Sequence, residues 1–344
     1  MAEPHQPTCP DQPRLPTGGR AATLAALELA RHSPGESLKQ WMARPRAAAV
    51  PKVLHQTWKN CTLPWRQAFW REECRRVLPD DWTLRLHTDD DNRAFIAREF
   101  PAYLELYDSY DVNIKRIDAV RYFYLYRYGG VYMDLDFTCL KPLEALPLTP
   151  GHASMGFQRF TIHDIESIAN AFMVAPPRHP FIASIIHRLN STARLLYHSK
   201  VHPMKATGCA FLTTAVERWQ RNYNNTGVLR IGHPRGYKAL AADAAANRTL
   251  TTLQGAALTV HLRPRIFNSD WMASGARSHP CGCDQKLGCA SRRELNGCQK
   301  NRLLTDAVVT TFWTHNWIDS MQTEVRAARN VSRDSVPSRG RVWK

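Results

Sequence analysis

The stretch GGVYMDLDFT, residues 129–138, places two carboxylates one residue apart behind a double glycine and a short apolar run. Such an apolar run predicts a strand that is buried on both faces. A buried strand should not end in two acids, Asp134 and Asp136, unless they serve a site. Ligands of open α/β sheets bind beyond the carboxyl ends of the strands. The stretch therefore predicts a sheet with a polar site at the end of this strand.

Helical and extended patterns alternate around this strand. Apolar and aromatic residues recur at helical spacing over 114–128, and Gly129 is a natural C-cap for that helix. The alternation predicts an α/β domain with a mostly parallel central sheet flanked by helices. We expect strands at 50–54, 82–88, 131–136, 153–158, 170–175, 257–262 and 307–313, and helices at 64–77, 88–107 (interrupted at Pro101), 114–128, 179–192 and 207–221.

Composition divides the chain into three parts. Residues 1–48 are rich in Pro, Ala and Arg, and we expect them to form a mobile extension. Residues 49–320 show no break in composition, so one domain is expected there, followed by a basic tail at 321–344. The longest apolar run near the start contains Glu28 and is too short to span a bilayer. No membrane anchor is therefore expected in this chain.

The formal net charge of the 344 residues is +16. Such a charge suits an acidic substrate, an anionic membrane surface or a nucleic acid. The Lys and Arg residues are scattered rather than clustered, and no zinc-finger or RNA-binding signature is present. We therefore expect no nucleic-acid partner, and keep association with a membrane surface open. The sequence does not indicate an oligomeric state.

Cysteines and glycosylation sequons both point to an oxidising compartment. Four of the nine cysteines lie within a loop at 279–298, and their spacing differs from that of a structural zinc site. We expect this loop to be closed by disulfides, with metal binding as the alternative. The four cysteines are Cys281, Cys283, Cys289 and Cys298, and the sequons begin at Asn60, Asn190, Asn224, Asn247 and Asn330.

Two enzyme chemistries use acids in this arrangement. The pattern D-x-D-x-T after an apolar strand is typical of haloacid-dehalogenase-type phosphatases, in which the first Asp is a nucleophile. Those enzymes need further acids downstream, normally after a Gly-Asp pair, and this sequence contains no Gly-Asp pair. The motif also normally opens the domain, whereas strands and helices precede it here. The phosphatase is therefore the less favoured hypothesis.

The favoured chemistry is sugar transfer from a nucleotide-diphosphate sugar. In that chemistry the acids hold a divalent cation that neutralises the charge developing on the leaving diphosphate. Carboxylate oxygens suit Mn²⁺ or Mg²⁺. The double glycine lets the helix turn sharply into the strand and should leave room for the donor. Asp118 and Arg121 lie three residues apart on the preceding helix, hence on one face, and could bind sugar hydroxyls and a phosphate.

Four stretches occur in the order seen in glycosyltransferase family 32, a D-x-D sugar-transferase family that includes fungal Golgi α-mannosyltransferases. They are VPKVLHQTWKN, IDAVRYFYLYRYGGVYMDLDFTCLKPLEAL, NAFMVAPPRHPF and ATGCAFLT. The chain resembles the family well over 50–215 and loosely over 257–318. The stretch around residues 103–130 is most similar to inositol-phosphorylceramide mannosyltransferases. The family usually has Pro where this chain has Cys209, and it lacks the cysteine-rich loop.

The resemblance implies a GT-A-type nucleotide-sugar-binding fold, Mn²⁺ dependence and retention of anomeric configuration. The implied reaction moves a hexose, with mannose favoured, to a glycan or glycolipid hydroxyl in the Golgi or ER lumen. Asp136 matches the direct metal ligand, and Asp134 matches the residue that contacts ribose, sugar and the metal shell. The remaining residues that match binding positions, or adjoin them, are His55, Gln56, Trp58, Asp118, Arg121, Gly129, Gly130, Tyr132, His315 (as a further metal ligand) and Trp317. A non-catalytic basic lumenal binding protein on a transferase fold is the remaining alternative.

Overall fold

The computed structural model describes residue 9 and residues 48–146, 148, 150–160, 165–195, 201–222, 248–251, 257–261, 289–300 and 307–312. The strands are β1 (Val53–Thr57), β2 (Thr83–His87), β3 (Gly130–Met133), β4 (Phe137–Cys139), β5 (His152–Phe160), β6 (Ile165–Ala175), β7 (Arg248–Thr251), β8 (Ala257–His261) and β9 (Val309–Thr311). The helices are α3 (Trp65–Val77), α4 (Asp89–Glu99), η1 (Pro101–Tyr103), α5 (Leu104–Asp108), α6 (Asn113–Tyr128), η2 (Leu143–Ala145), α7 (Pro180–Leu195), α8 (Pro203–Ala206), α9 (Cys209–Asn222) and α12 (Arg292–Lys300).

The central sheet has the strand order β2-β1-β3-β6-β5-β8-β7 within the described residues. The predicted α/β class is confirmed, but the sheet is mixed rather than mostly parallel. Strands β2, β1 and β3 are parallel, and so are β5 and β8, whereas β3–β6, β5–β6 and β7–β8 are antiparallel. Only antiparallel strands can be joined by a short connection, and only four residues separate β5 from β6 along the chain. The hydrophobic pattern does not distinguish such a hairpin from a crossover.

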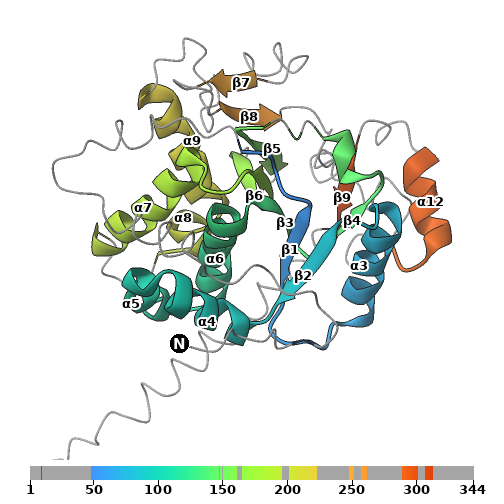
Figure 1. The fold of residues 1–344 in the computed structure, drawn as a ribbon, viewed down its shortest axis with the longest axis horizontal. Helices are drawn as coiled ribbons and strands as arrows, with labels where there is room; N and C mark the ends of the chain where they lie inside the picture. Colours follow the sequence, from blue (N-terminus) through green and yellow to red (C-terminus); the bar gives the residue numbers. More distant parts are fainter. Residues whose placement is uncertain are drawn as a thin grey trace, which may run out of the picture.

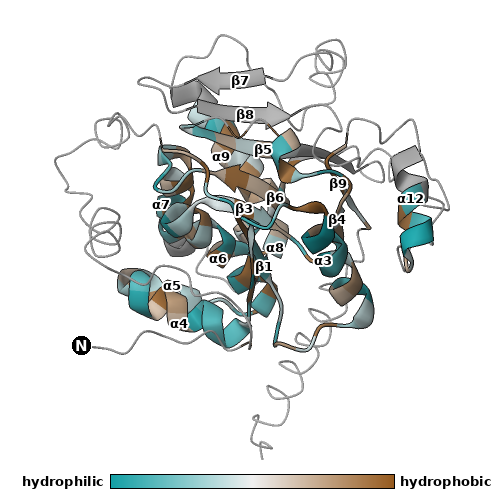
Figure 2. Ribbon diagram, turned by 45° about the vertical axis from the view of Figure 1, so that its right-hand side comes forward, coloured by the Kyte–Doolittle hydropathy of each residue, from teal (hydrophilic) through white to brown (hydrophobic). Residues whose placement is uncertain are grey.

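Helices cover the sheet unequally (Figure 1). Helices α4–α9 gather on one side, while α3, α12 and the small β4–β9 sheet lie on the other. The hydropathy view shows apolar colour on inner strands such as β6, whereas teal and brown segments alternate along the outer helices α4 and α5 (Figure 2). No helix in the described ranges is both long and apolar enough to cross a membrane.

Strand β3 is buried on both faces, as the sequence predicts. Val131 and Met133 pack in the cluster against α3, while Tyr132 packs in the cluster formed with α6. The strand ends at Met133, earlier than the predicted 131–136, because the chain turns at Asp134. Residues 137–139 then leave the main sheet and pair antiparallel with β9. The turn separates the two acids from the strand and places them at its carboxyl end.

The double glycine is required by the backbone and by close packing. Gly129 and Gly130 have φ values of +67° and +95°, which side chains disfavour. A Cβ at Gly129 would lie 2.6 Å from Pro177, and one at Gly130 would lie 2.4 Å from the Val53 carbonyl oxygen. The sharp turn into β3 is therefore confirmed. The room that the glycines were expected to leave for a donor is instead filled by protein atoms.

Disulfides fix two segments around β3. Cys74 of α3 is bonded to Cys139 of β4, closing a loop with a sequence separation of 65. In the chain-entropy account, a disulfide that closes a loop of this size stabilises the folded state by about 4 kcal/mol. Cys9 is bonded to Cys61, so residue 9 of the expected extension is tied to the domain. Cys289 is also disulfide-bonded, in agreement with a disulfide-closed loop, while the side chains of the other three loop cysteines lie outside the described residues.

Two histidines are buried together between β1, β2 and α6. His55 Nε2 is 3.0 Å from the Gly129 carbonyl oxygen and must donate to it. His55 Nδ1 therefore accepts from His87 Nε2 at 3.0 Å, and the Tyr124 ring stacks on both imidazoles. Burial lowers the pKa of His55 to about 4 and also lowers that of His87. Both rings are neutral in the folded state near neutral pH.

The buried pair predicts a loss of stability in acid. Between its unfolded pKa of about 6.5 and its folded pKa of about 4, His55 binds a proton in the unfolded chain but not in the folded protein. The contribution of His55 to stability is therefore fully present above about pH 6.5 and is lost as the pH falls toward about 4. The expected loss from His55 is about 3 kcal/mol across this window. His55→Gln can still donate to Gly129, so the stability advantage of the parent should shrink as the pH falls. Urea unfolding of both proteins measures it, and a pH-independent difference would contradict the assignment.

Candidate functional site

Asp134 and Asp136 stand at the carboxyl end of β3 with their backbones held on two sides. The Asp134 amide donates to the Ala171 carbonyl of β6 at 2.9 Å, and the Phe312 amide donates to the Asp136 carbonyl at 2.9 Å. Both side chains are half-buried, and that of Asp134 is 33% exposed. Pairing of β4 with β9 thus delivers a distant part of the chain to the second acid. The two carboxylates are accessible on a rigid frame.

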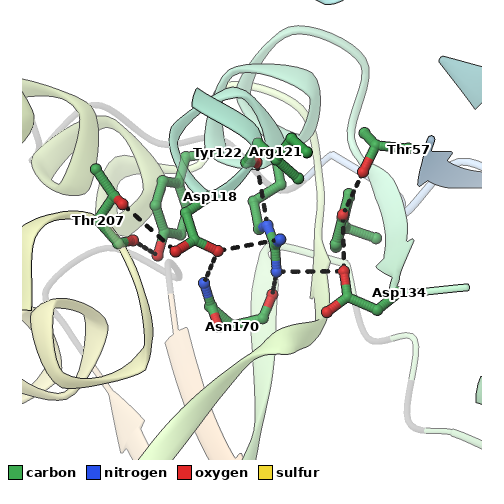
Figure 3. A network of polar contacts seen from close by, with 9 residues as sticks. Thr57, Asp118, Arg121, Tyr122, Asp134, Asn170 and Thr207 are labelled. Atoms are coloured by element: carbon green, nitrogen blue, oxygen red, sulfur yellow. Dashed lines mark hydrogen bonds and ion pairs between the residues drawn. The ribbon is translucent and has the colours of Figure 1, made fainter. Parts of the chain in front are cut away.

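Arg121 of α6 lies between two carboxylates (Figure 3). Its guanidinium is 3.1 Å from Asp118 Oδ1 and 3.4 Å from Asp134 Oδ1, and it donates to the Asn170 carbonyl at 2.8 Å. The Arg121 side chain is only 2% exposed. Burial alone would lower the pKa of this guanidinium, but Asp134, the Tyr132 hydroxyl and Asp118 together raise it above its ordinary value. Arg121 is therefore a permanent buried charge, and the predicted Asp118–Arg121 pair is confirmed as a contact.

Asp118 is held by amide and hydroxyl groups as well as by Arg121. Asn170 Nδ2 donates to Oδ1 at 2.8 Å, and the Thr207 hydroxyl approaches Oδ2 at 3.4 Å. Burial raises the pKa of Asp118 to about 6, although Arg121 opposes the shift. A Cβ at Gly208 would lie 2.9 Å from Asp118 Oδ2, so only a glycine fits against this oxygen. Asp118 thus has one oxygen saturated and one only weakly bonded.

Tyr132 fixes the orientation of Asp134. Its hydroxyl donates to Asp134 Oδ1 at 2.9 Å, so the Thr57 hydroxyl, 2.9 Å away, must donate to Tyr132. The Arg121 guanidinium lies 4.5 Å from the centre of the Tyr132 ring, as in a cation–π contact. The Asp134 carboxylate is thereby oriented through one oxygen, Oδ1 (Figure 3). Tyr132 is a positioning residue in this geometry.

The two acids fit a divalent cation with hard oxygen ligands. Asp134 Oδ1 is occupied by Tyr132 and Arg121, and the half-exposed Asp136 carboxylate lies at the same turn. The described residues contain no group of three or more His, Cys, Asp or Glu that could hold a metal. A cation of the Mn²⁺ or Mg²⁺ type prefers about six oxygen ligands. Water, a substrate or residues beyond 312 would have to supply the rest.

The predicted site residues of β1 and the loop after it differ in whether their polar groups are already bonded within the protein. His55 uses both ring nitrogens within the protein, in the pair with His87, and faces α6 rather than the acids. Gln56 and Trp58 each carry a buried N–H, Nε2 and Nε1 respectively, with no hydrogen-bond partner in the described structure. Trp58 also packs in a small cluster with Leu135, the residue between the two acids. These two N–H groups remain candidates for a ligand contact.

His315 and Trp317 lie outside the described residues. The chain just before them is placed, because Phe312 is hydrogen-bonded to Asp136. Three residues can span about 10 Å. His315 is therefore within reach of the second acid by chain length alone, and its role stays a prediction.

Sequence reasoning did not single out Thr57, Asn170 or Thr207. Thr57 and Thr207 contribute their hydroxyl groups, and Asn170 contributes both its side-chain amide and its backbone carbonyl, each from a different part of the chain. Asn170 interrupts the apolar run IANAFMVA of β6, and that interruption is a signal that could have been read. Thr57 and Thr207 carry no comparable signal, since threonine is common at the ends of strands and helices.

Comparisons with known proteins match the segment that carries Asp118, Arg121 and the two acids of this network. Residues 57–153 match the family model described as a glycosyltransferase sugar-binding region containing a DXD motif. The chain is 36% identical over 176 residues to "Inositol phosphoceramide mannosyltransferase 3" of Schizosaccharomyces pombe, covering 51% of this chain and 47% of that protein. It is 35% identical over 191 residues to "Mannosyl phosphorylinositol ceramide synthase CSH1" of Saccharomyces cerevisiae, covering 55% and 49%.

The chain thus spans about half the length of these curated relatives. Among solved structures, the "PaToxG Glycosyltransferase" aligns with 84% of this chain and 98% of its own, at 12% identity and a TM-score of 0.41. The resemblance to DXD glycosyltransferases is confirmed for the region that contains Asp118, Arg121, Asp134 and Asp136.

The network predicts that Arg121 is essential for stability as well as for any binding. Arg121→Met leaves the buried Asp118 without its counter-charge, at a cost of about 3–5 kcal/mol. Without Arg121 the folded pKa of Asp118 should rise further above its unfolded value, so the variant loses stability as the pH rises through that range. The deficit relative to the parent should therefore be smaller at about pH 5 than at about pH 7.

Urea unfolding at the two pH values measures this deficit. Arg75→Met is the matched control, because Arg75 forms an exposed pair with Glu72. Such exposed pairs contribute little. An Arg121→Met deficit that is small, or equal at both pH values, would refute the account of Arg121 as the counter-charge of Asp118.

Proposed function

Because residues 57–153 match the sugar-binding region of DXD glycosyltransferases, we propose that this protein transfers a hexose from a nucleotide-diphosphate sugar to a hydroxyl group. Mannose is the favoured sugar, and a glycolipid of the inositol phosphoceramide kind is the favoured acceptor, by analogy with the named relatives. The observation that carries the proposal is the Asp118–Arg121–Asp134 network at the carboxyl end of β3, beside Asp136.

In this proposal Asp136, and Asp134 beside it, would hold Mn²⁺ or Mg²⁺, which would supply positive charge to a leaving diphosphate. Asp136 would be the direct ligand. Asp134 is held by Tyr132 and Arg121 at Oδ1, which leaves Oδ2 for a contact with the metal shell or the donor. The unsatisfied N–H groups of Gln56 and Trp58 support a contact with the nucleotide at the end of β1.

Asp118 and Arg121 bind the sugar side of the donor in this account. Asp118 Oδ2 has one long hydrogen bond among the described residues, to Thr207, so it keeps the capacity to accept hydrogen bonds from sugar hydroxyls. Arg121 holds Asp118 and Asp134 at a fixed separation and directs its positive charge toward the donor phosphates. A Lys could not replace this forked geometry.

Retention of configuration by front-face attack of the acceptor is the proposed stereochemistry. Asp118 is ion-paired with Arg121, accepts a hydrogen bond from Asn170 and has a side chain only 10% exposed. A buried carboxylate that is already paired with a cation is a poor covalent nucleophile. No observation in the described residues favours the phosphatase, and the non-catalytic binding protein is separated from a transferase by assay.

An oxidising compartment such as the Golgi or ER lumen is proposed as the location. Cys9–Cys61, Cys74–Cys139 and the disulfide at Cys289 support it, since such bonds persist outside the reducing cytosol. The sequon residues Asn60 and Asn190 are both exposed, as glycosylation requires. The sequons at Asn224, Asn247 and Asn330 lie outside the described residues.

Asp136→Asn tests the proposed reaction. It removes one charge from a half-exposed side chain, so transfer from GDP-mannose should fall by about a hundredfold or more with the fold intact. Product formation on an inositol phosphoceramide acceptor, followed by mass spectrometry, measures it, and Asp80→Asn is the control for losing an exposed acid. Unchanged turnover of Asp136→Asn would rule out this donor site.

A second variant tests the predicted C-terminal ligand. His315→Ala should weaken the apparent Mn²⁺ affinity by about tenfold or more, the scale of losing one supported ligand. Excess Mn²⁺ should then restore much of the rate. A titration of activity against Mn²⁺ in parent and variant measures this, and identical curves would remove His315 from the site.

A further inference from the structure

The loop that follows β1 lies beside the two acids. Trp58 and Leu63 pack against a small cluster of Cys9, Leu86 and Leu135, and Leu135 is the residue between Asp134 and Asp136. The loop is fixed at several points, because Cys61 is bonded to Cys9 and the Trp58 amide donates to the His87 carbonyl at 3.0 Å. We refer to residues 59–66, which comprise this loop and the first two residues of α3, as the rim loop. It forms a rigid border of the candidate site.

The rim loop exposes a tryptophan. Trp65 is 57% exposed and is the one large hydrophobic side chain that is exposed in the part of the chain the structure describes. The Arg66 guanidinium lies 4.4 Å from the centre of the Trp65 ring, so a cation accompanies the indole. Tryptophan is enriched where a membrane meets water, because its ring is apolar and its N–H is polar. The apolar ring also makes the exposure of Trp65 to bulk water unfavourable.

The cations on the rim loop lack acidic partners. Neither Lys59 nor Arg66 forms an ion pair with any described residue, although Arg75 and Arg76 at the far end of α3 both pair with Glu72. Unpaired cations beside an exposed indole match the headgroup layer of a membrane that contains anionic lipid. The formal net charge of +16 also favours attraction to an anionic membrane surface.

We propose that the rim loop docks on an anionic lipid membrane, with Trp65 in the headgroup layer and Lys59 and Arg66 on lipid phosphates. Docking at this border turns the acids toward the membrane surface, where the headgroup of a lipid acceptor is presented. The inference rests on the proposed function for the nature of the acceptor only. Adsorption to vesicles requires no donor, metal or turnover.

Vesicle sedimentation tests the docking directly. The probe is phosphatidylcholine vesicles with about 30% phosphatidylserine, compared with pure phosphatidylcholine. Trp65→Ala should weaken partitioning to the anionic vesicles by about tenfold. Lys59→Ala and Arg66→Ala should each weaken it by about fivefold, with the effect lost in high salt. Arg76→Ala is the matched control, and it should change little because Arg76 is already paired.

Two further arrangements keep the outcome clear. All variants carry Thr62→Ala, which removes the sequon that begins at Asn60 in the same loop. Urea unfolding verifies that each variant is folded, and hydrolysis of the nucleotide sugar in solution should not change in Trp65→Ala. If the parent does not hydrolyse nucleotide sugars, the proposed reaction is refuted. The vesicle measurement would still test the docking, because it does not depend on that activity.

Equal partitioning of Trp65→Ala and the parent would overturn the proposal. A concentration-dependent dimer of the parent that Trp65→Ala abolishes, with vesicle binding unchanged, would overturn it in favour of a contact between two copies. Reduced partitioning of the rim-loop variants, together with normal partitioning of Arg76→Ala, is the result that the proposal expects.

Discussion

The buried guanidinium of Arg121 is the interaction on which the candidate site depends. It separates and orients Asp118 and Asp134, which would repel each other without it. One positive charge against two carboxylates leaves a formal excess of one negative charge, before Asp136 is added. Asp136 brings the formal charge to −2, which a divalent cation would balance, and the cation would keep coordination positions for the oxygens of a donor diphosphate. The described geometry therefore suits a site that binds metal and donor together.

Several elements of the fold hold this arrangement rigid. Gly129 and Gly130 allow α6 to turn straight into β3, so the helix that carries Arg121 and the strand that ends in the acids are adjacent in both sequence and space. Strand β6 supplies Asn170 from the neighbouring position in the sheet, and β9 closes the other side by bonding Phe312 to Asp136. The Cys74–Cys139 disulfide ties α3 to the strand that follows the acids. These groups come from distant parts of the chain, so the acids and Arg121 are held in position by tertiary contacts.

The central part of the site could be predicted from sequence because it is local. Asp118, Arg121, Gly129, Asp134 and Asp136 lie within nineteen consecutive residues, and helical spacing and strand period place them without reference to the rest of the fold. The mixed pairing of the sheet was not predictable, since a strand pattern does not reveal the direction of its neighbour. His55 was expected at the nucleotide, yet a second histidine on β2, thirty-two residues away, fixes its role as a buried partner. The glycines were expected to leave room, yet Pro177 and Val53 fill it.

The central claim is that the acids form a metal-dependent donor site, and ligand-induced stabilisation tests it most directly. A ligand at a hundred times its dissociation constant stabilises the fold by about 2.7 kcal/mol. Thermal unfolding of the parent should therefore shift upward by about 5 °C or more with GDP-mannose and Mn²⁺ together. GDP-mannose in EDTA should produce little shift, and UDP-sugars with Mn²⁺ should produce less than GDP-mannose. No shift with any nucleotide sugar in Mn²⁺, or an equal shift in EDTA, would contradict the account.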